Sequence, residues 1–428
     1  MKKKYFLNAN IIDPQNSLDE VGGLIINEEG KIEAIGKKVN ENNIPSREKY
    51  IDLKNKHIFP GIVDMRVFIG EPGYEYKENF KTLSNAALSG GVTSVVTMPN
   101  TSPIIDNVSM VDFVKRRGRD KSKINIFPTA SLTKNLEGSN MTEFGLLQKK
   151  GIIGFTDGIK TIQNTRLMSK IMNSAHDLNS LIIQHAEDYS LSENGMVNDG
   201  IISTKLGLEG IPDIAEKIII DRDLTLLEQI KCRYHISQIS AAKSIDTINK
   251  KKQFLKFSCG VSINNLSLNE NDIGDFRTFL KLSPPLRTED DRLALVEGLN
   301  KKTIDVIVSD HKPEDEEQKR LTFSKAATGS SGIETLLSLS LELFHNGSVK
   351  LNTIIEALTS NPAKILKINK GNLTIGNNAD FCIVDINKPW VVKKENLLSK
   401  SKNTSIENKK IQGKVINTFV DGQELYKG

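Results

Sequence analysis

Eight short apolar runs alternate with helix-like stretches through the middle of this 428-residue chain. The runs are residues 62–68, 93–98, 124–130, 152–156, 181–185, 234–239, 254–258 and 305–309. Strands that are buried on both faces read as continuous apolar runs, and eight strand-then-helix units in one row are typical of a closed barrel. The pattern therefore predicts the α/β class and a (β/α)8 TIM barrel. A doubly wound open sheet more often carries a glycine-rich turn after its first strand, and none is present.

Both ends of the chain have a different pattern, rich in short β segments. Residues 10–13, 23–26 and 32–35 suggest a small meander, and residues 379–385 and 415–420 read as strands. Neither set can bury a face alone, so we expect the two ends to pair. This predicts a small composite β-sandwich domain from residues 1–58 and 368–428, beside a barrel over residues 59–367.

Composition argues against several classes of protein. The net charge of +5 comes from 58 basic and 53 acidic residues that are scattered along the chain, so we expect no nucleic-acid partner. No apolar run approaches the ~20 residues that a membrane span needs, and the amino terminus lacks a signal-like apolar stretch. Three widely separated cysteines argue against disulfides and thiolate zinc sites. We expect a cytoplasmic protein.

The first apolar run leads into a stretch that constrains function. Residues 60–73 read PGIVDMRVFIGEPG. This resembles the signature of dihydroorotases, which hydrolyse and re-form a cyclic amide in pyrimidine synthesis and whose strand reads Asp-x-His-x-His-x-Arg-Glu-Pro-Gly. The resemblance places the two zinc-binding histidines at Arg66 and Phe68, and a carboxylate-binding arginine at Gly70. Arginine and phenylalanine have no lone pair to offer a metal, so this pair cannot bind one.

Other segments resemble the same family in the same order along nearly the whole chain. They read TMPNT at 97–101, FTDG at 155–158, QHAED at 184–188, YHISQIS at 234–240, KLSPPLR at 281–287, SDHKPE at 309–314 and FSKAATGSSGIET at 323–335. The resemblance implies the amidohydrolase type of barrel, with a small β domain built from both chain ends.

Four positions keep the residue that the resemblance implies. Asn100 would contact substrate, Asp157 and His185 would bind metal, and Asp310 would bind metal and act as the general base. Three of them also have an ordinary structural interpretation: Asn100 as a turn asparagine, Asp157 as a turn aspartate before glycine, and His185 as a histidine at a strand end. We therefore expect Asp310 to be a vestigial base, and Asp157 and His185 to be vestigial metal ligands that bind a metal weakly or not at all.

Three further positions are altered. The resemblance implies a zinc-binding histidine at Gln238, a substrate-binding asparagine at Ser283 and a substrate-binding histidine at Glu314. His235 corresponds to a family histidine that is not a ligand. Metal-binding and substrate-binding groups have therefore changed together.

Hydrolysis of a cyclic amide in this family needs one or two divalent ions, and a zinc site needs three or four good ligands. Here His185, Asp157 and Asp310 remain, so we expect no zinc or weakly held zinc. Arg66 places a permanent cation where the first ligand belonged, and we expect it to pair with Asp157 or Asp310. This favours a non-catalytic member of the family. An active dihydroorotase, or a related metal-dependent cyclic amidohydrolase with a rearranged site, remains the alternative.

The intact pattern of strands, helices and glycine turns suggests that the fold itself is required. The resembled family includes inactive members that assemble with aspartate transcarbamoylase, so the resemblance implies a structural partner of that enzyme in a homo- or hetero-oligomer. A recently silenced gene, and a ligand sensor that uses Arg66 to hold an anion, are the other possibilities.

Overall fold

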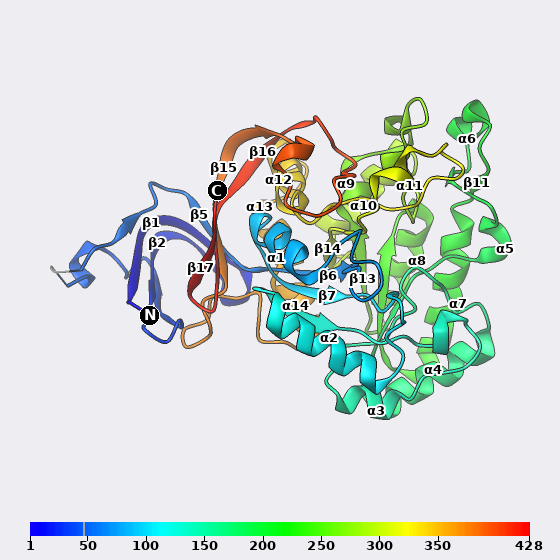
Figure 1. Cartoon of the computed structure of the whole chain (residues 1–428), viewed down its shortest axis with the longest axis horizontal. Helices are drawn as coiled ribbons and strands as arrows, with labels where there is room; N and C mark the ends of the chain where they lie inside the picture. Colours follow the sequence, from blue (N-terminus) through cyan, green and yellow to red (C-terminus); the bar gives the residue numbers. More distant parts are fainter. Residues whose placement is uncertain (46–47) are drawn as a thin grey trace.

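The structure is a computed structural model that describes residues 1–45 and 48–428, and it has two parts, a barrel and a smaller β domain (Figure 1). The barrel strands are β6 (Ile62–Val67), β7 (Val92–Thr97), β8 (Asn125–Pro128), β9 (Leu181–Gln184), β12 (Arg233–Ile239), β13 (Ser258–Ser262) and β14 (Val306–Val308). They lie in two parallel sheets of order β6-β7-β8 and β14-β13-β12-β9.

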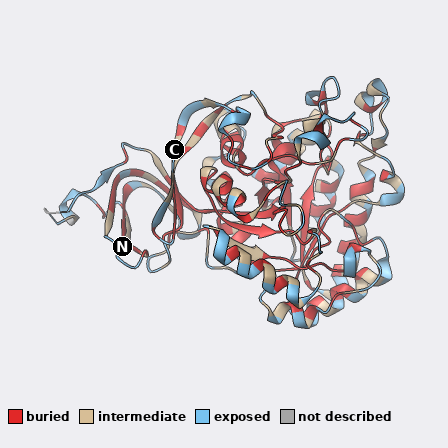
Figure 2. Ribbon diagram, viewed as in Figure 1, coloured by how far each residue is buried: buried red, intermediate tan, exposed pale blue. Residues whose placement is uncertain are grey.

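Isolated parallel bridges close these sheets into a ring. Phe155 bridges Ala130 on one side and Ile182 on the other, and Val67 bridges His311. The ring confirms the predicted barrel, and β6, β7, β9 and β14 are buried along their whole length (Figure 2).

Two strand predictions were wrong in detail. The fourth run, residues 152–156, forms no regular strand, and only Phe155 makes bridges there. Backbone hydrogen bonds of residues 153–156 to both neighbouring strands nevertheless give it the fourth place in the ring. The seventh run was placed at 254–258, but the strand is Ser258–Ser262, and Phe254 is 64% exposed in the connection after a helix. An apolar run therefore marked the approach to a strand rather than the strand itself.

The barrel helices follow the predicted alternation. They are α1 (Phe80–Ser89), α2 (Val108–Lys121), α3 (Phe144–Lys149), α4 (Thr165–Asp177), α7 (Ile214–Ile230), α8 (Ala242–Lys252), α10 (Glu289–Asn300), α12 (Leu336–His345), α13 (Leu351–Leu358) and α14 (Ser360–Leu366). The Asn79 and Thr288 side chains cap the first turns of α1 and α10, because each accepts from a backbone N–H that has no partner inside its helix.

Shorter elements lie mainly in the connections. They are α5 (Tyr189–Ser192), α6 (Ile201–Leu206), α9 (Ile263–Ser267), α11 (Glu316–Arg320), β10 (Val197–Asn198), β11 (Gly210–Ile211), η1 (Pro14–Asn16), η2 (Glu41–Asn43), η3 (Lys134–Leu136), η4 (Glu270–Ile273), η5 (Thr278–Leu280) and η6 (Lys394–Asn396). In the part of the chain that the structure describes, no helix is both long and apolar enough to cross a membrane.

The β domain joins the two ends of the chain, as predicted. Its strands are β1 (Lys4–Asp13), β2 (Leu18–Ile26), β3 (Ile32–Gly36), β4 (Ile51–Asp52), β5 (His57–Pro60), β15 (Phe381–Val391), β16 (Lys410–Val420) and β17 (Gln423–Lys427). The order is β17-β16-β15-β5-β1-β2-β3, with β4 beside β1, so β5 links the amino-terminal strands to the carboxyl-terminal ones. The domain boundaries at 58/59 and 367/368 stay a prediction.

Three aromatic rings form the centre of this domain. Phe6 of β1 meets Phe381 of β15 edge-on, with ring centroids 5.7 Å apart, and Phe381 stacks on Phe419 of β16 at 4.4 Å. All three side chains are fully buried. The first strand of the chain and the last ones therefore share one core.

We expect Phe381→Ala to lower the free energy of unfolding by about 3–5 kcal/mol, because it leaves a cavity between the two chain ends. Phe254→Ala is the matched control, since Phe254 is 64% exposed, and it should cost less than about 0.5 kcal/mol. Urea denaturation followed by circular dichroism measures both. Equal losses for the two variants would contradict the shared core.

Candidate functional site

The carboxyl ends of the barrel strands meet around the side chain of Arg66, which is 3% exposed at the end of β6. Its Nε donates to Asp310 Oδ1 at 2.9 Å, just beyond β14. Its Nη1 donates to Ser237 Oγ of β12 at 2.7 Å and to the carbonyl oxygen of Gly158 at 3.3 Å. The guanidinium is thus held from several sides of the ring.

Asp310 is the anion of this buried pair. Burial raises the pKa of its carboxyl, while the charge and hydrogen bond of Arg66 oppose that rise. The backbone of Asp310 has a φ of 50°, in the left-handed region that aspartate tolerates better than most residues. The expected partnership of Arg66 with an aspartate is confirmed for Asp310.

Asp157 does not pair with Arg66. Its Oδ1 accepts from the backbone N–H groups of Leu132 at 2.8 Å and Thr133 at 3.0 Å, and its Oδ2 accepts from Thr133 Oγ1 at 2.5 Å. Burial raises the pKa of Asp157 to about 6, against the effect of these hydrogen bonds. The carboxylate therefore anchors the connection that follows β8.

His185 lies buried after β9, with its Nε2 3.4 Å from Glu187 Oε2. Its Nδ1 has no hydrogen-bond partner among the described residues, and the same holds for Asn100 Oδ1 and Gln238 Oε1. The Nε2 of Gln238 donates to the carbonyl oxygen of Ser283 at 2.8 Å. The barrel mouth thus keeps several buried polar atoms that could meet a ligand or water.

Lysines surround the loop that follows β14. Lys281 Nζ donates to the carbonyls of Phe323 and Ser324 at 2.9 and 3.0 Å, and Lys312 Nζ donates to that of Thr328 at 2.6 Å. Lys319 Nζ donates to two carbonyls, one of them that of Ala327 at 2.7 Å, and burial lowers its pKa to about 7. Ammonium groups therefore fix this loop over the mouth.

The residues present do not fit a metal centre. Within residues 1–45 and 48–428, no group of three or more His, Cys, Asp or Glu side chains could hold a metal ion. Asp310 is paired with Arg66, Asp157 is bound by backbone N–H groups, and His185 faces Glu187. The donor atoms that remain therefore do not converge on one point.

Comparisons with known proteins identify the family. A family model described as dihydro-orotase-like matches residues 55–244. A dihydroorotase of Ehrlichia canis is 40% identical over 424 residues, covering 98% of this chain and 94% of the relative. One of Syntrophus aciditrophicus is 39% identical over 419 residues, covering 98% of each chain. The chain belongs to the dihydroorotase family.

Solved structures support the fold of this dihydroorotase-family protein. An L-hydantoinase (dihydropyrimidinase) from Arthrobacter aurescens superposes with a TM-score of 0.88 at 22% identity, covering 99% of this chain and 96% of the other. A dihydropyrimidinase from Brevibacillus agri gives 0.84 at 20% identity, covering 99% and 95%. These likenesses show the fold, a barrel with a β domain.

The altered family positions have acquired structural contacts of their own. Phe68 is buried, with its ring 6.0 Å from that of Tyr74. Gly70 has a φ of 75°, and a Cβ there would lie 2.4 Å from the carbonyl oxygen of Glu78, so this loop leaves no room for the arginine that the resemblance implies. Glu314 Oε2 lies 2.6 Å from Lys77 Nζ in a buried ion pair.

Sequence reasoning missed two contributors to the site. Ser237 accepts from Arg66, and its signal was its place on β12, one residue before the altered position Gln238. Lys312 lies at the mouth, two residues after Asp310 in the last strand-end motif, where its charge could have been noticed.

We expect Arg66→Met to lower the free energy of unfolding by about 3–5 kcal/mol, because it leaves the Asp310 carboxylate buried without its cation. Arg119→Met is the matched control, since its pair with Asp120 is exposed and should contribute less than about 1 kcal/mol. Adding Asp310→Asn to Arg66→Met should recover part of the loss. Urea denaturation of these three variants, of the Asp310→Asn single variant and of the wild type measures the coupling, and additive losses would contradict it.

The lowered pKa of Lys319 predicts that the free energy of unfolding depends on pH. Its pKa is about 7 in the folded protein and about 10.4 when unfolded, so between these values the unfolded chain binds more protons. The free energy of unfolding should therefore rise with pH by about 1.4 kcal/mol per unit from this group alone. Compared with Lys319→Met, the wild type should gain stability between about pH 7 and about pH 9. Lys149→Met, on the exposed end of α3, provides the control. Parallel pH profiles for wild type and Lys319→Met would refute the assignment.

Proposed function

We propose that this dihydroorotase-family protein of pyrimidine biosynthesis is non-catalytic and acts as a structural partner of aspartate transcarbamoylase. The observation that carries the first half of the proposal is the buried pair between Arg66 and Asp310. It lies where the resemblance places both a metal ligand and the general base.

The charge of Arg66 argues against a metal at this point. Two unit charges 4 Å apart interact by about 4 kcal/mol at an effective dielectric constant of 20, so Arg66 alone would repel a divalent ion at that distance by about 8 kcal/mol. Asp310, which would attract the ion, is already paired with the guanidinium. Arginine stays protonated in proteins and cannot relieve this repulsion. Among the described residues, no three ligand side chains converge on one point, so metal–ligand bonds cannot offset this repulsion.

The pair also ties up the residue that would move the proton. A general base needs a free carboxylate oxygen within hydrogen-bond reach of its substrate. Asp310 Oδ1 already accepts from Arg66 Nε at 2.9 Å. A proton taken up at this carboxylate would weaken the ion pair, because the charge and hydrogen bond of Arg66 favour its ionised form and so lower its basicity.

The intact fold supports the second half of the proposal. The barrel ring is closed, and the two chain ends share one aromatic core. A chain that has lost its chemistry but keeps this architecture is suited to bind another protein. An obligate interface with aspartate transcarbamoylase would bury about 2,000 Å² or more.

An active dihydroorotase, or a related cyclic amidohydrolase with a rearranged site, is the alternative. It is favoured by the buried polar atoms at the mouth, His185 Nδ1, Asn100 Oδ1 and Gln238 Oε1, which lack partners in the described chain. Such atoms suit contact with a polar substrate.

We expect hydrolysis of dihydroorotate and cyclisation of carbamoyl aspartate to stay at the background rate, with or without added zinc. The spectrophotometric assay should include the Syntrophus aciditrophicus relative, prepared in the same way, as the positive control. Turnover by a preparation shown to be free of host enzyme would support the alternative instead.

We expect the tagged protein to co-purify with the aspartate transcarbamoylase of its own organism when the two are expressed together. Gel filtration at micromolar concentration should give one peak that contains both chains. If they elute separately, and if deleting this gene leaves the transcarbamoylase activity unchanged, the scaffold role is wrong.

A further inference from the structure

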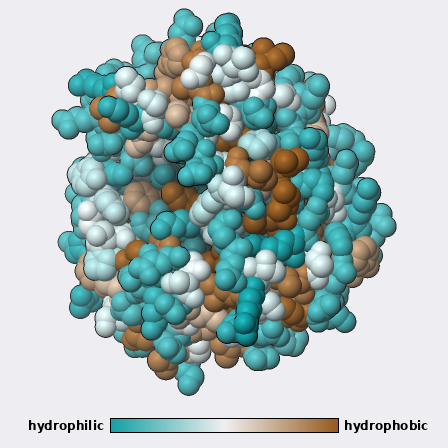
Figure 3. Space-filling model, turned by 90° about the vertical axis from the view of Figure 1, so that its right-hand side faces the viewer, coloured by the Kyte–Doolittle hydropathy of each residue, from teal (hydrophilic) through white to brown (hydrophobic). Residues whose placement is uncertain are grey.

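A cavity of about 320 Å³ remains at the barrel mouth, between the connections that follow β9, β13 and β14. This size falls in the range of small-molecule sites, and the carboxyl face of the barrel is where such sites occur. Figure 3 views the molecule from the side of α5 and α6, and on this face hydrophobic residues gather beside a hollow in the surface. Polar and apolar side chains both line the cavity.

One wall of the cavity carries a cation. Lys312 Nζ donates to the carbonyl oxygen of Thr328 at 2.6 Å and lies 3.8 Å from Glu314 Oε1. An ammonium has three hydrogens to donate, so this group retains capacity for a ligand. The Lys312 side chain is 19% exposed and lines the cavity.

A different wall carries an anion. Glu187 follows β9, its Oε1 accepts from Ser192 Oγ at 2.8 Å, and its Oε2 lies 3.4 Å from His185 Nε2. Its side chain is 18% exposed, and a carboxylate can accept about four hydrogen bonds, so it too can meet a ligand.

The rest of the lining is mixed. Lys281 and Glu314 also line the cavity, but Lys281 Nζ donates to two backbone carbonyls and Glu314 pairs with Lys77. Met196 and Ile211 come from the connection after β9, and Leu282 lies in the connection before α10. An uncharged side chain of a ligand would gain from contact with these residues. The cavity thus offers a cation, an anion and an apolar wall.

We propose that this cavity binds a free α-amino acid with an uncharged side chain. The ligand carboxylate pairs with Lys312, its ammonium pairs with Glu187, and its side chain packs against Met196 and Ile211. A ligand with a single charge would cover one of the two protein charges without pairing with it, which costs free energy of desolvation. The inference goes beyond the proposed function, because a scaffold needs no ligand, and it requires neither a metal nor the transcarbamoylase.

Isothermal titration calorimetry on the full chain, treated with a chelator, tests this proposal. The probes are L-leucine, L-methionine and L-glutamine, each with its amide and its N-acetyl derivative, which lack one of the two charges. We expect at least one amino acid to bind saturably, and both of its derivatives to bind about tenfold more weakly or worse. Absence of binding by all three amino acids would overturn the proposal.

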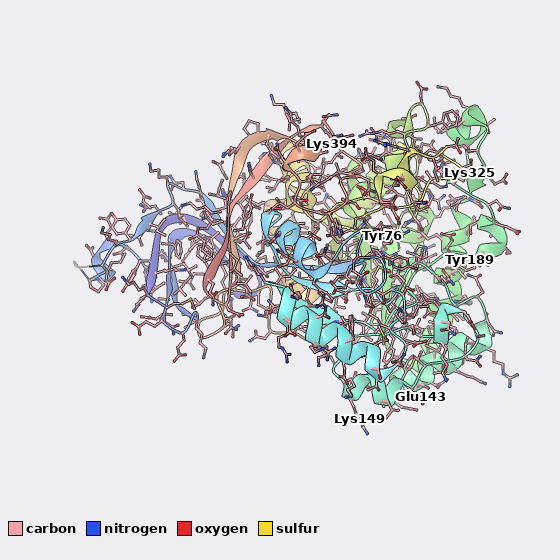
Figure 4. The ribbon with its side chains drawn as sticks, viewed as in Figure 1. Tyr76, Glu143, Lys149, Tyr189, Lys325 and Lys394 are labelled. Atoms are coloured by element: carbon pink, nitrogen blue, oxygen red, sulfur yellow. The ribbon has the colours of Figure 1, made fainter. Side chains whose placement is uncertain are left out.

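Matched variants locate the site. Lys312→Met and Glu187→Gln should each weaken binding about tenfold or more. Lys149→Met and Glu143→Gln are the charge-matched controls, on the exposed surface at α3 (Figure 4), and should bind like the wild type. Thermal melts verify that all four variants fold.

Equal affinity of Lys312→Met, Glu187→Gln and the wild type would place any binding elsewhere and overturn the assignment. Co-purification with the transcarbamoylase is unaffected by that result, so the two proposals fail separately.

Discussion

The buried ion pair of Arg66 and Asp310 sets the chemistry of this barrel. A guanidinium in the mouth needs acceptors, and the structure supplies them from Asp310, Ser237 and the carbonyl of Gly158. Because these groups come from separate strands and connections, the arginine cross-links the ring at the position where the family resemblance implies a metal ligand. The positive charge of the site is therefore part of the chain and does not depend on metal supply.

The neighbouring groups are arranged around this fixed cation. Asp157 is turned to the backbone N–H groups of Leu132 and Thr133, so it is unavailable to Arg66. Glu314 pairs with Lys77, and Gln238 donates to a carbonyl. A site with these contacts suits the binding of a charged small molecule better than polarisation of an amide by a metal.

Much of the fold could be predicted from the sequence, because burial on both faces leaves continuous apolar runs and eight of them occurred in one row. The apolar run at residues 152–156 marked the fourth place in the ring correctly, although only Phe155 makes bridges there. Where an apolar residue such as Phe254 is exposed, the pattern misplaces the strand. For the site, the chemistry of the residue types alone showed that Arg66 cannot serve as a metal ligand. The sequence could not show that Arg66 pairs with Asp310 and not with Asp157. Asp157 accepts from backbone N–H groups instead, and no sequence motif predicts those hydrogen bonds.

Zinc titration of two proteins tests most directly the claim that Arg66 replaces the metal. One is the wild type, and the other carries Arg66→His, Phe68→His and Gln238→His, which restore the ligands that the family resemblance implies. Calorimetry with elemental analysis after dialysis should find no retained zinc in the wild type and stoichiometric zinc in the triple variant, because the repulsive charge is gone and three imidazoles join His185. One zinc ion per wild-type chain, held as tightly as in the triple variant, would contradict the account.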